Sequence, residues 1–259
     1  MKRGILIGVG SWGKWWCEQF LPPNIADGTI EIAAAVDQNP ACLETARRFL
    51  HLPDSRCFTG TEAAFASVPA DFCIVVVPPA FHEPVIDAAI RHNLHILSEK
   101  PIADTLESSI RIAGKVAQAG LRMGVTMSHR FDQDKTNFSE LIRSGVYGRL
   151  DYLSCRYTCD LRRYGSWGDF RHEIPYSLLI EGSVHHLDLL ASIAGAKCKT
   201  IYCRSWRPAW AEYKGDCQAL VTMEFENGVH AVYEAANANA VSLNPWGNEY
   251  LRAECEKGT

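Results

Sequence analysis

Two hydrophobic periods alternate along the first half of the chain. Short apolar or β-branched runs have the pattern of strands that are buried on both faces. They lie at residues 4–9, 30–36, 72–77, 94–98 and 121–127. Amphipathic stretches separate them and predict helices at residues 11–20, 40–50, 82–92 and 104–119. Because strands and helices alternate, residues 1–127 are predicted to form a doubly wound parallel sheet.

A different pattern begins after residue 127. It predicts helices at 132–144 and 180–194 and strands at 149–159, 199–206, 216–226 and the returning VHAVYEA. Asn227-Gly228 predicts a two-residue hairpin turn before the returning strand. The strand at 216–226 has an apolar face of Ala219, Val221, Met223 and Phe225, and an opposite face of Gln218, Leu220, Thr222 and Glu224. Residues 128–259 are therefore predicted to form an α+β domain with an open, mostly antiparallel sheet.

The composition excludes several classes of protein. The chain has 26 basic and 30 acidic side chains among 259 residues and a formal net charge of -4. That balance argues against binding to nucleic acid or to an anionic membrane surface. No apolar run approaches the ~20 residues of a membrane span, and the glycine-broken start MKRGILIGVGSWG predicts a first strand instead of a signal peptide. The sequence predicts a soluble, cytoplasmic protein.

The cysteines favour free thiols over a disulfide scaffold. All ten are scattered along the chain, several lie inside apolar runs, and none forms a CxxC pair. Structural zinc is therefore not expected. The pattern is typical of mostly buried thiols in a reducing cytosol.

The stretch GILIGVGSWGKWW places three glycines between a predicted strand and a predicted helix. Gly8 allows a tight turn, Gly10 lets the backbone approach a pyrophosphate, and Gly13 lets helix and strand pack closely. Asp37 ends the second strand, where a carboxylate can bind both ribose hydroxyls and repel a 2′-phosphate. The arrangement predicts a dinucleotide-binding Rossmann domain that prefers NAD to NADP. Glycines that serve only packing are the alternative.

The segment HILSEKPI ends the fourth predicted strand with a carboxylate, an ammonium and a proline. In a doubly wound sheet, ligands bind outside the carboxyl ends of the strands. Glu99 and Lys100 are therefore predicted to lie on the same rim as the glycine loop. A surface lysine paired to Glu99 is the alternative.

With this segment, the whole chain resembles the Gfo/Idh/MocA family of dinucleotide-dependent oxidoreductases, whose hallmark is EKP after this strand. The resemblance rests on GVGSWG, VDQNP, VPPAFH, HILSEKP, SHRF, SGVYGRL, EGSVHHLDLL and the ENG hairpin. It implies that Lys100 lies beside the nicotinamide, where an ammonium stabilises a developing alkoxide. Glu99 is expected to orient the lysine or the loop. The implied cofactor contacts come from Gly8, Gly10, Ser11, Trp12, Gly13, Asp37, Pro78, His82, Glu99 and Lys100.

The second part of the predicted site lies in EGSVHHLDLL. Glu181, His185 and Asp188 are spaced i, i+4 and i+7 and share one face of a helix. The resemblance implies that His185 exchanges the substrate proton, with Glu181 as its acidic partner at a position where the family often has aspartate. A capping glutamate and a packed histidine are the alternatives. Asp188 is predicted to be a structural hydrogen-bond acceptor, and His186 is assigned no role.

Other candidates are less specific. His172 could join His185 and Asp188 as metal ligands, but no metal-binding spacing connects them, so no metal site is predicted. The loop before the His185 helix carries aromatic and guanidinium groups that suit either sugar contacts or an oligomer surface. These groups belong to Arg162, Arg163, Tyr164, Trp167 and Arg171.

These observations predict an NAD-dependent oxidoreductase that transfers a hydride between nicotinamide and a carbinol carbon of a sugar or cyclic polyol. In this hypothesis His185 takes the hydroxyl proton and Lys100 stabilises the oxygen. A non-catalytic dinucleotide-sensing protein and a reductase of a non-sugar substrate, such as an imine or a tetrapyrrole, are the alternatives. The family usually continues beyond NEYLRAECEKGT, so the resemblance implies a truncated C-terminus. It also implies a homo-oligomer formed through the second sheet, with Leu220 on the outer face.

Overall fold

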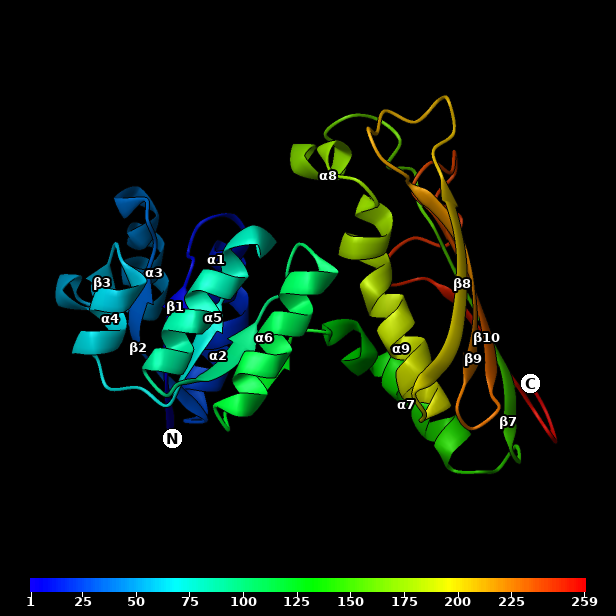
Figure 1. The fold of residues 1–259 in the computed structure, drawn as a ribbon, viewed down its shortest axis with the longest axis horizontal. Helices are drawn as coiled ribbons and strands as arrows, with labels where there is room; N and C mark the ends of the chain where they lie inside the picture. Colours follow the sequence, from blue (N-terminus) through cyan, green and yellow to red (C-terminus); the bar gives the residue numbers. More distant parts are fainter. The chain divides into compact units, whose positions relative to one another are not determined.

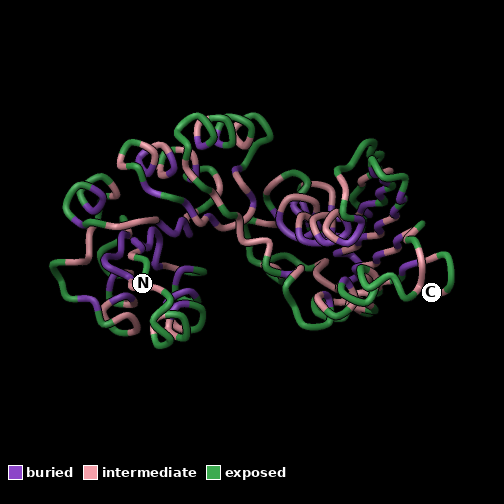
Figure 2. Tube along the Cα trace, turned by 90° about the horizontal axis from the view of Figure 1, so that it is seen from below, coloured by how far each residue is buried: buried purple, intermediate pink, exposed green.

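The chain forms two compact units, Met1–Thr126 and Met127–Thr259. The structure is a computed structural model that describes all 259 residues (Figure 1). Buried residues gather inside each unit, so each has a hydrophobic core of its own (Figure 2). No helix combines the length and the apolar character needed to cross a membrane. All ten cysteines are free thiols.

The first unit is built on a six-stranded sheet with the order β3-β2-β1-β4-β5-β6. All of its strand pairs are parallel. The strands are β1 (Lys2–Ile7), β2 (Ile30–Val36), β3 (Cys57–Phe58), β4 (Phe72–Val75), β5 (His95–Ser98) and β6 (Met123–Val125). The chain order reverses between β1 and β4, which is the position where doubly wound sheets bind ligands. The predicted Rossmann fold is confirmed.

Helices cover both faces of this sheet and bury its apolar side chains. Ile5 packs with Ile86 in one core and its neighbour Leu6 packs with Ile74 in the other, because successive strand residues point to opposite faces. Each of these side chains contributes about 1.5–3 kcal/mol by its burial. The helices are α1 (Ser11–Trp15), η1 (Trp16–Phe20), α2 (Leu21–Ala26), η2 (Pro40–Cys42), α3 (Leu43–Leu50), η3 (Asp54–Arg56), α4 (Thr61–Ser67), η4 (Pro79–Phe81), α5 (His82–Arg91) and α6 (Leu106–Gln118).

Several boundaries differ from the predicted ones. The first helix was predicted to end at residue 20, but α1, η1 and α2 run on to Ala26. Prolines occupy the first turn of α2, where their fixed φ suits the helical backbone. The sequence pattern also missed β3 and α4, which are short. Thr105 caps α6, since its Oγ1 accepts a hydrogen bond from the Ser108 N–H at 3.1 Å.

The second unit contains a five-stranded sheet with the order β11-β7-β10-β9-β8. The β10–β7 pair is parallel and the other pairs are antiparallel. The strands are β7 (Leu150–Thr158), β8 (Cys198–Trp206), β9 (Gln218–Phe225), β10 (His230–Ala236) and β11 (Tyr250–Cys255). The helices are η5 (Ser128–Phe131), α7 (Gln133–Arg143), α8 (Asp169–Glu173), η6 (Leu178–Ser183) and α9 (Val184–Ala194). The predicted α+β class with an open, mostly antiparallel sheet is confirmed.

One face of this sheet packs against α9, η6 and α7, and the other is open. Side chains of β9 alternate between buried and accessible as predicted, with Val221 buried and Leu220 exposed. The β9–β10 turn differs from the prediction. It is a three-residue loop closed by the Gly228 N–H, which donates to Phe225 O at 2.9 Å. Gly228 has φ +84°, so it supplies the left-handed residue that such a loop requires.

Candidate functional site

The glycine loop joins β1 to α1. A Cβ on Gly8 would lie 2.2 Å from Val76 O, and φ is +92°, so only glycine fits. A Cβ on Gly13 would lie 2.1 Å from Gly8 O, so helix and strand approach too closely for a side chain. At Gly10 the nearest atom to an added Cβ is Cys42 Sγ at 3.3 Å. Packing inside the protein therefore demands glycine at the first and third positions, whereas at the second a Cβ would require only a small shift of the Cys42 side chain.

The start of α1 and the end of β2 fit a dinucleotide. Gly10 is the N-cap residue, and no side chain caps this helix end, which leaves first-turn N–H groups for a phosphate. Asp37 Oδ2 accepts hydrogen bonds from the N–H groups of Val9 and Gly10 at 2.9 and 3.1 Å, and Oδ1 accepts one from Asn39 N–H at 2.9 Å. Oδ2 thus uses both of its lone pairs, whereas Oδ1 keeps one. Asp37 thus shapes the glycine loop and can still bind a ribose.

The Glu99 clasp is a contact that the sequence did not reveal. Glu99 Oε1 accepts the indole N–H groups of Trp12 and Trp16, each at 2.8 Å. Its Oε2 accepts the Thr126 hydroxyl at 2.8 Å and the Lys100 backbone N–H at 3.2 Å. The carboxylate therefore fastens the end of β5 to the helix of the glycine loop. Its predicted orienting role is supported by these bonds, and the cofactor contact of Trp12 stays a prediction.

Lys100 lies just beyond the carboxyl end of β5. Strands β1 and β5 run parallel, so their carboxyl ends share one edge of the sheet with the glycine loop. The residue is partly exposed, whereas Ser98 two positions earlier is fully buried. The peptide bond from Lys100 to Pro101 is cis. The lysine thus has the rim position that the sequence predicted.

His82 and Pro78 flank the loop between β4 and α5. His82 is fully buried, with Nε2 2.9 Å from Val77 O and Nδ1 3.1 Å from Ile102 O. The ring therefore links this loop to the segment that follows EKP, which is a positioning role. Pro78 and Ser11 are exposed. Direct contact of these three residues with the cofactor stays a prediction.

In the second unit, Glu181 lies in η6, a π-helical turn that leads into α9. Its side chain is only 5% exposed, and the Nη2 atom of Arg171 lies 3.1 Å from its Oε2. Arg171 also donates to Trp167 O at 3.0 Å and lies over the ring of Phe170 at 4.5 Å. The guanidinium therefore compensates the buried carboxylate. The sequence had placed this arginine in the preceding loop without naming its partner.

His185 and Asp188 occupy the first two turns of α9. The His185 side chain is buried, and its ring centroid lies 5.2 Å from that of Trp246. Asp188 pairs through both oxygens with Arg130, and the Arg130 Nε to Asp188 Oδ2 distance is 2.6 Å. This ion pair raises the pKa of Arg130. The structural role predicted for Asp188 is confirmed by the contact, while the proton exchange by His185 stays a prediction.

The structure does not bring His172, His185 and Asp188 together as a group of metal ligands. His172 is fully buried, stacks on Tyr213 at 4.0 Å between ring centroids, and donates through Nδ1 to Glu212 O at 2.9 Å. Asp188 is occupied by its arginine. His172 therefore serves packing and Asp188 ion pairing within the second unit.

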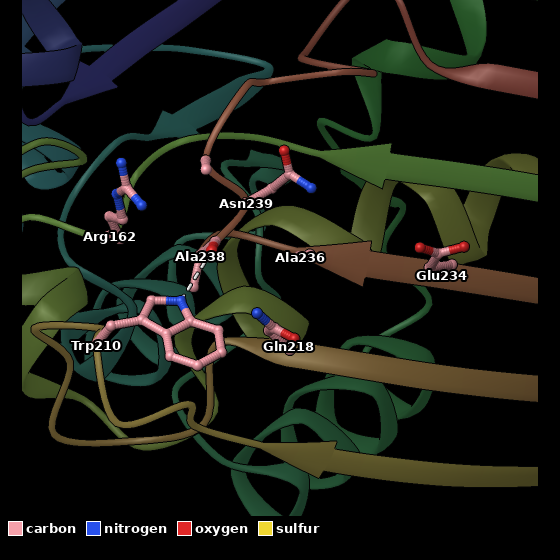
Figure 3. Close-up of a pocket in the computed structure, with 8 residues that line it drawn as sticks. Arg162, Trp210, Gln218, Glu234, Ala236, Ala238 and Asn239 are labelled. Carbon is pink, nitrogen blue, oxygen red and sulfur yellow. Dashed lines mark hydrogen bonds between the residues drawn. The ribbon is translucent and has the colours of Figure 1, made fainter.

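Two arginines of the loop before η6 form ion pairs with carboxylates. Arg162 Nε lies 3.1 Å from Asp160 Oδ1, and Arg163 donates to Glu212 at 2.8 Å. Arg162 also lines a cleft of about 440 Å³, in which the Trp210 indole donates to Ala238 O at 3.3 Å (Figure 3). None of the predicted catalytic residues lines this cleft. Sugar contacts by the loop stay a prediction.

Three residues that the sequence passed over form a buried cluster. His129, His186 and Glu249 place one ligand-type atom each within 4.8 Å of one another. Burial lowers the pKa of His186, against the opposing influence of Glu249. Burial alone raises the pKa of Glu249, but His129, His186 and Lys135 together hold it well below its usual value. No compact motif joins these positions, so only the fold could reveal the cluster.

The fold and the glycine loop define an NAD-binding oxidoreductase domain followed by an α/β domain. Residues 2–127 match the family model of oxidoreductases with an NAD-binding Rossmann fold, and residues 139–251 match the C-terminal alpha/beta domain of the same family. The chain belongs to the Gfo/Idh/MocA oxidoreductase family.

Known proteins resemble most of this chain. It is 54% identical to the uncharacterized protein y4oX of Sinorhizobium fredii over 98% of this chain and 70% of that protein. It is 30% identical to inositol 2-dehydrogenase of Corynebacterium glutamicum over 88% of this chain and 66% of that enzyme. A crystal structure of an Agrobacterium radiobacter oxidoreductase with NAD+, L-tartaric acid and magnesium has the same fold, with a TM-score of 0.86 and 19% identity over 98% of this chain and 72% of that one. The chain thus spans about two thirds of the length of these curated relatives.

Proposed function

We propose that this chain provides the cofactor and substrate sites of an NAD-dependent oxidoreductase acting on a carbinol carbon of a sugar or cyclic polyol. NAD, when bound, supplies the hydride acceptor or donor. The observation that carries the proposal is the Glu99 clasp, which fixes Lys100 on the sheet edge that also holds the glycine loop. The inositol 2-dehydrogenase relative favours a cyclic polyol as the substrate class.

Each residue of the proposed site has a separate task. The Lys100 ammonium donates a hydrogen bond to the reacting oxygen and stabilises the negative charge that develops there. The His185 imidazole takes the hydroxyl proton during oxidation and returns it during reduction. Glu181, held by Arg171, presents a buried negative charge one turn before that histidine. Such a charge favours the imidazolium that forms when the proton is taken.

The test compares Lys100→Met with wild-type protein. NADH formation is measured across a panel of inositols and aldoses, and NAD affinity is measured by titration. We expect NAD affinity to be kept and turnover to fall by about 10²–10³-fold, the usual cost of a lost electrostatic contact. Lys115→Met is the matched control, because Lys115 is ion-paired to Asp87 on a helix surface and should keep turnover.

Three outcomes would contradict parts of the proposal. Wild-type turnover in Lys100→Met would remove the lysine from the mechanism. NAD binding by the wild-type chain without turnover of any substrate would favour a dinucleotide-sensing protein. Reduction of an imine or tetrapyrrole, with no activity on polyols, would favour a non-sugar substrate.

Cofactor choice is proposed to depend on Asp37. A carboxylate there repels the 2′-phosphate of NADP and accepts hydrogen bonds from the ribose of NAD. Asp37→Ser should therefore lower the ratio of NAD to NADP affinity by at least about 10-fold, since a hydrogen bond to a charged group contributes about 1.5–3 kcal/mol. Asp27→Ser, at the end of α2, is the control and should leave the ratio unchanged. An unchanged ratio in Asp37→Ser would refute the ribose contact.

We also propose that chains associate through the open face of the second sheet, in the cytoplasm. Large apolar side chains are exposed on that face, including Tyr202 at 69% and Leu220 at 48%. The ten free thiols favour a reducing compartment. Light scattering on Leu220→Lys should report a smaller particle than wild type; a monomeric wild-type chain would refute the association.

A further inference from the structure

A buried cluster in the second unit joins three segments that are far apart in the sequence. His129 lies in η5 and His186 in α9, and Glu249 directly precedes β11. All three side chains are 0% exposed. The Nε2 atoms of both histidines lie 3.4 Å from the same carboxylate atom, Glu249 Oε1. Two imidazoles and a carboxylate therefore converge on one point inside the protein.

The outer nitrogen of each imidazole faces an acceptor. His129 Nδ1 lies 2.7 Å from Asp132 Oδ2, where a proton on Nδ1 makes the contact favourable although the pair lacks ordinary hydrogen-bond geometry. His186 Nδ1 lies 2.8 Å from the Tyr233 hydroxyl, which itself donates to Ser183 Oγ at 3.0 Å. With the tyrosine proton directed at the serine, His186 Nδ1–H donates to the tyrosine oxygen. A neutral imidazole protonated at Nδ1 presents a lone pair at Nε2, so both rings turn lone pairs toward Glu249.

Glu249 Oε1 also accepts the Gly247 N–H at 2.8 Å. Two imidazole lone pairs that face the same oxygen still repel it unless a cation lies between them. Protons on the two Nε2 atoms would make only poor hydrogen bonds to Glu249. Charge-assisted hydrogen bonds measure about 2.7–2.9 Å, whereas both Nε2 to Oε1 distances are 3.4 Å. Neither ring nitrogen of His129 makes a hydrogen bond of ordinary geometry. Burial also disfavours an imidazolium. In contrast, ligands bound to one ion at about 2.0–2.2 Å in a tetrahedral site are separated by about 3.3–3.6 Å.

The surrounding charges allow a divalent cation. Lys135 is buried with its Nζ 2.9 Å from Glu249 Oε2 and contacts Asp134 as well. This ammonium holds the carboxylate oxygen that does not face the histidines. Asp132, Asp134 and Glu249 together carry three negative charges, which one divalent ion and Lys135 balance. Acceptors on the outer nitrogens of ligating histidines are the usual support of a metal site.

We propose that His129, His186 and Glu249 bind a divalent transition metal ion of the zinc type in the second unit. Two imidazole nitrogens and one carboxylate oxygen are a ligand set that zinc accepts, and a fourth position is left for water. The ion ties η5, α9 and the start of β11 together. Its ligand His186 is adjacent to His185 in the sequence, so the ion stiffens the helix that presents the proposed proton carrier. It takes no part in hydride transfer.

The test uses the full chain without an affinity tag, stripped with a chelator and then titrated with Zn²⁺ or Co²⁺. We expect about one ion per chain, visible absorption bands of four- or five-coordinate Co²⁺, and a rise in the melting temperature on binding. Histidine and acid variants follow: His129→Gln and Glu249→Gln should bind the ion at least about 10-fold more weakly. His172→Gln is the matched control, because it removes another fully buried histidine and should keep the ion.

Two results would overturn the proposal. Absence of stoichiometric Zn²⁺ and of Co²⁺ bands in the wild-type chain would mean that protons and Lys135 alone compensate the cluster. Equal ion affinity in wild type and His129→Gln, with circular dichroism showing a folded variant, would place the ion elsewhere. Absence of the Co²⁺ bands in the wild-type chain refutes the site even where a variant fails to fold.

Discussion

The Glu99 clasp makes a quantitative prediction for Glu99→Gln. The glutamine oxygen can still accept the two indole N–H groups of Trp12 and Trp16. Its NH₂ group then occupies the position of Oε2, where it meets the Thr126 hydroxyl and the backbone N–H of Lys100. The hydroxyl can reverse its direction, but the amide N–H cannot. The variant therefore replaces charged hydrogen bonds by neutral ones. It also places the glutamine NH₂ group against the Lys100 backbone N–H, so that two donors face each other.

The expected cost follows from the four bonds that the carboxylate accepts. Hydrogen bonds to charged groups contribute about 1.5–3 kcal/mol and neutral ones about 0.5–1.5 kcal/mol. Each retained bond should weaken by roughly 1 kcal/mol, and the bond to the Lys100 N–H should be lost. Because Glu99 is partly exposed, water offsets part of the loss. We expect the free energy of unfolding of the first unit to fall by about 2–4 kcal/mol.

Urea unfolding followed by tryptophan fluorescence measures this change, since Trp12 and Trp16 report on the clasp itself. NAD affinity should fall in parallel, because the helix of the glycine loop loses its tie to β5. Glu107→Gln, an exposed glutamate in the first turn of α6, is the control and should shift stability by less than about 0.5 kcal/mol. A Glu99→Gln protein as stable as this control would refute the reasoning.

Two further predictions concern the glycine loop and acid stability. Gly13→Ala should unfold the loop or lower stability by several kcal/mol, about the upper range for point mutations, whereas Gly10→Ala should stay folded and lose NAD affinity; equal melting temperatures would contradict this contrast. Arg111 and Lys115 lower the pKa of Glu83 to about 2. The stabilisation from this carboxylate is full above its ordinary pKa and is lost as the pH falls toward 2. The melting temperature of Glu83→Gln should therefore drop less than that of wild type between about pH 5 and pH 3; parallel curves would argue against the ion pairs.

The positions of five of the six parallel strands could be predicted because each of these five leaves a continuous apolar run. The glycine loop and Asp37 could be placed for the same reason, since a motif between a strand and a helix has one position in such a sheet. Strand β1 is an instructive exception. Its apolar run continues to Val9, but the strand ends at Ile7 because Gly8 takes a positive φ and turns the chain. Hydrophobicity alone does not report backbone direction.

Contacts between distant residues could not be predicted from the sequence. Trp12 and Glu99 are 87 residues apart, and Arg130 and Asp188 are 58 apart. His186 was assigned no role because it faces away from Glu181 and His185 on an ideal helix. The fold instead turns it inward against Tyr233, on a strand 47 positions later. Such pairings are set by the packing of whole elements, which a single sequence does not record.

Each unit carries one π-helical turn: η1 holds Trp16, which donates to Glu99, and η6 holds Glu181 of the proposed site. A π turn contains one amino acid more than an α turn would need. Removing one position from η6, such as Gly182, would restore regular winding and rotate what precedes it by about 100° relative to α9. Glu181 would then swing away from Arg171. One additional residue in this turn thus sets the direction in which the Glu181 carboxylate points.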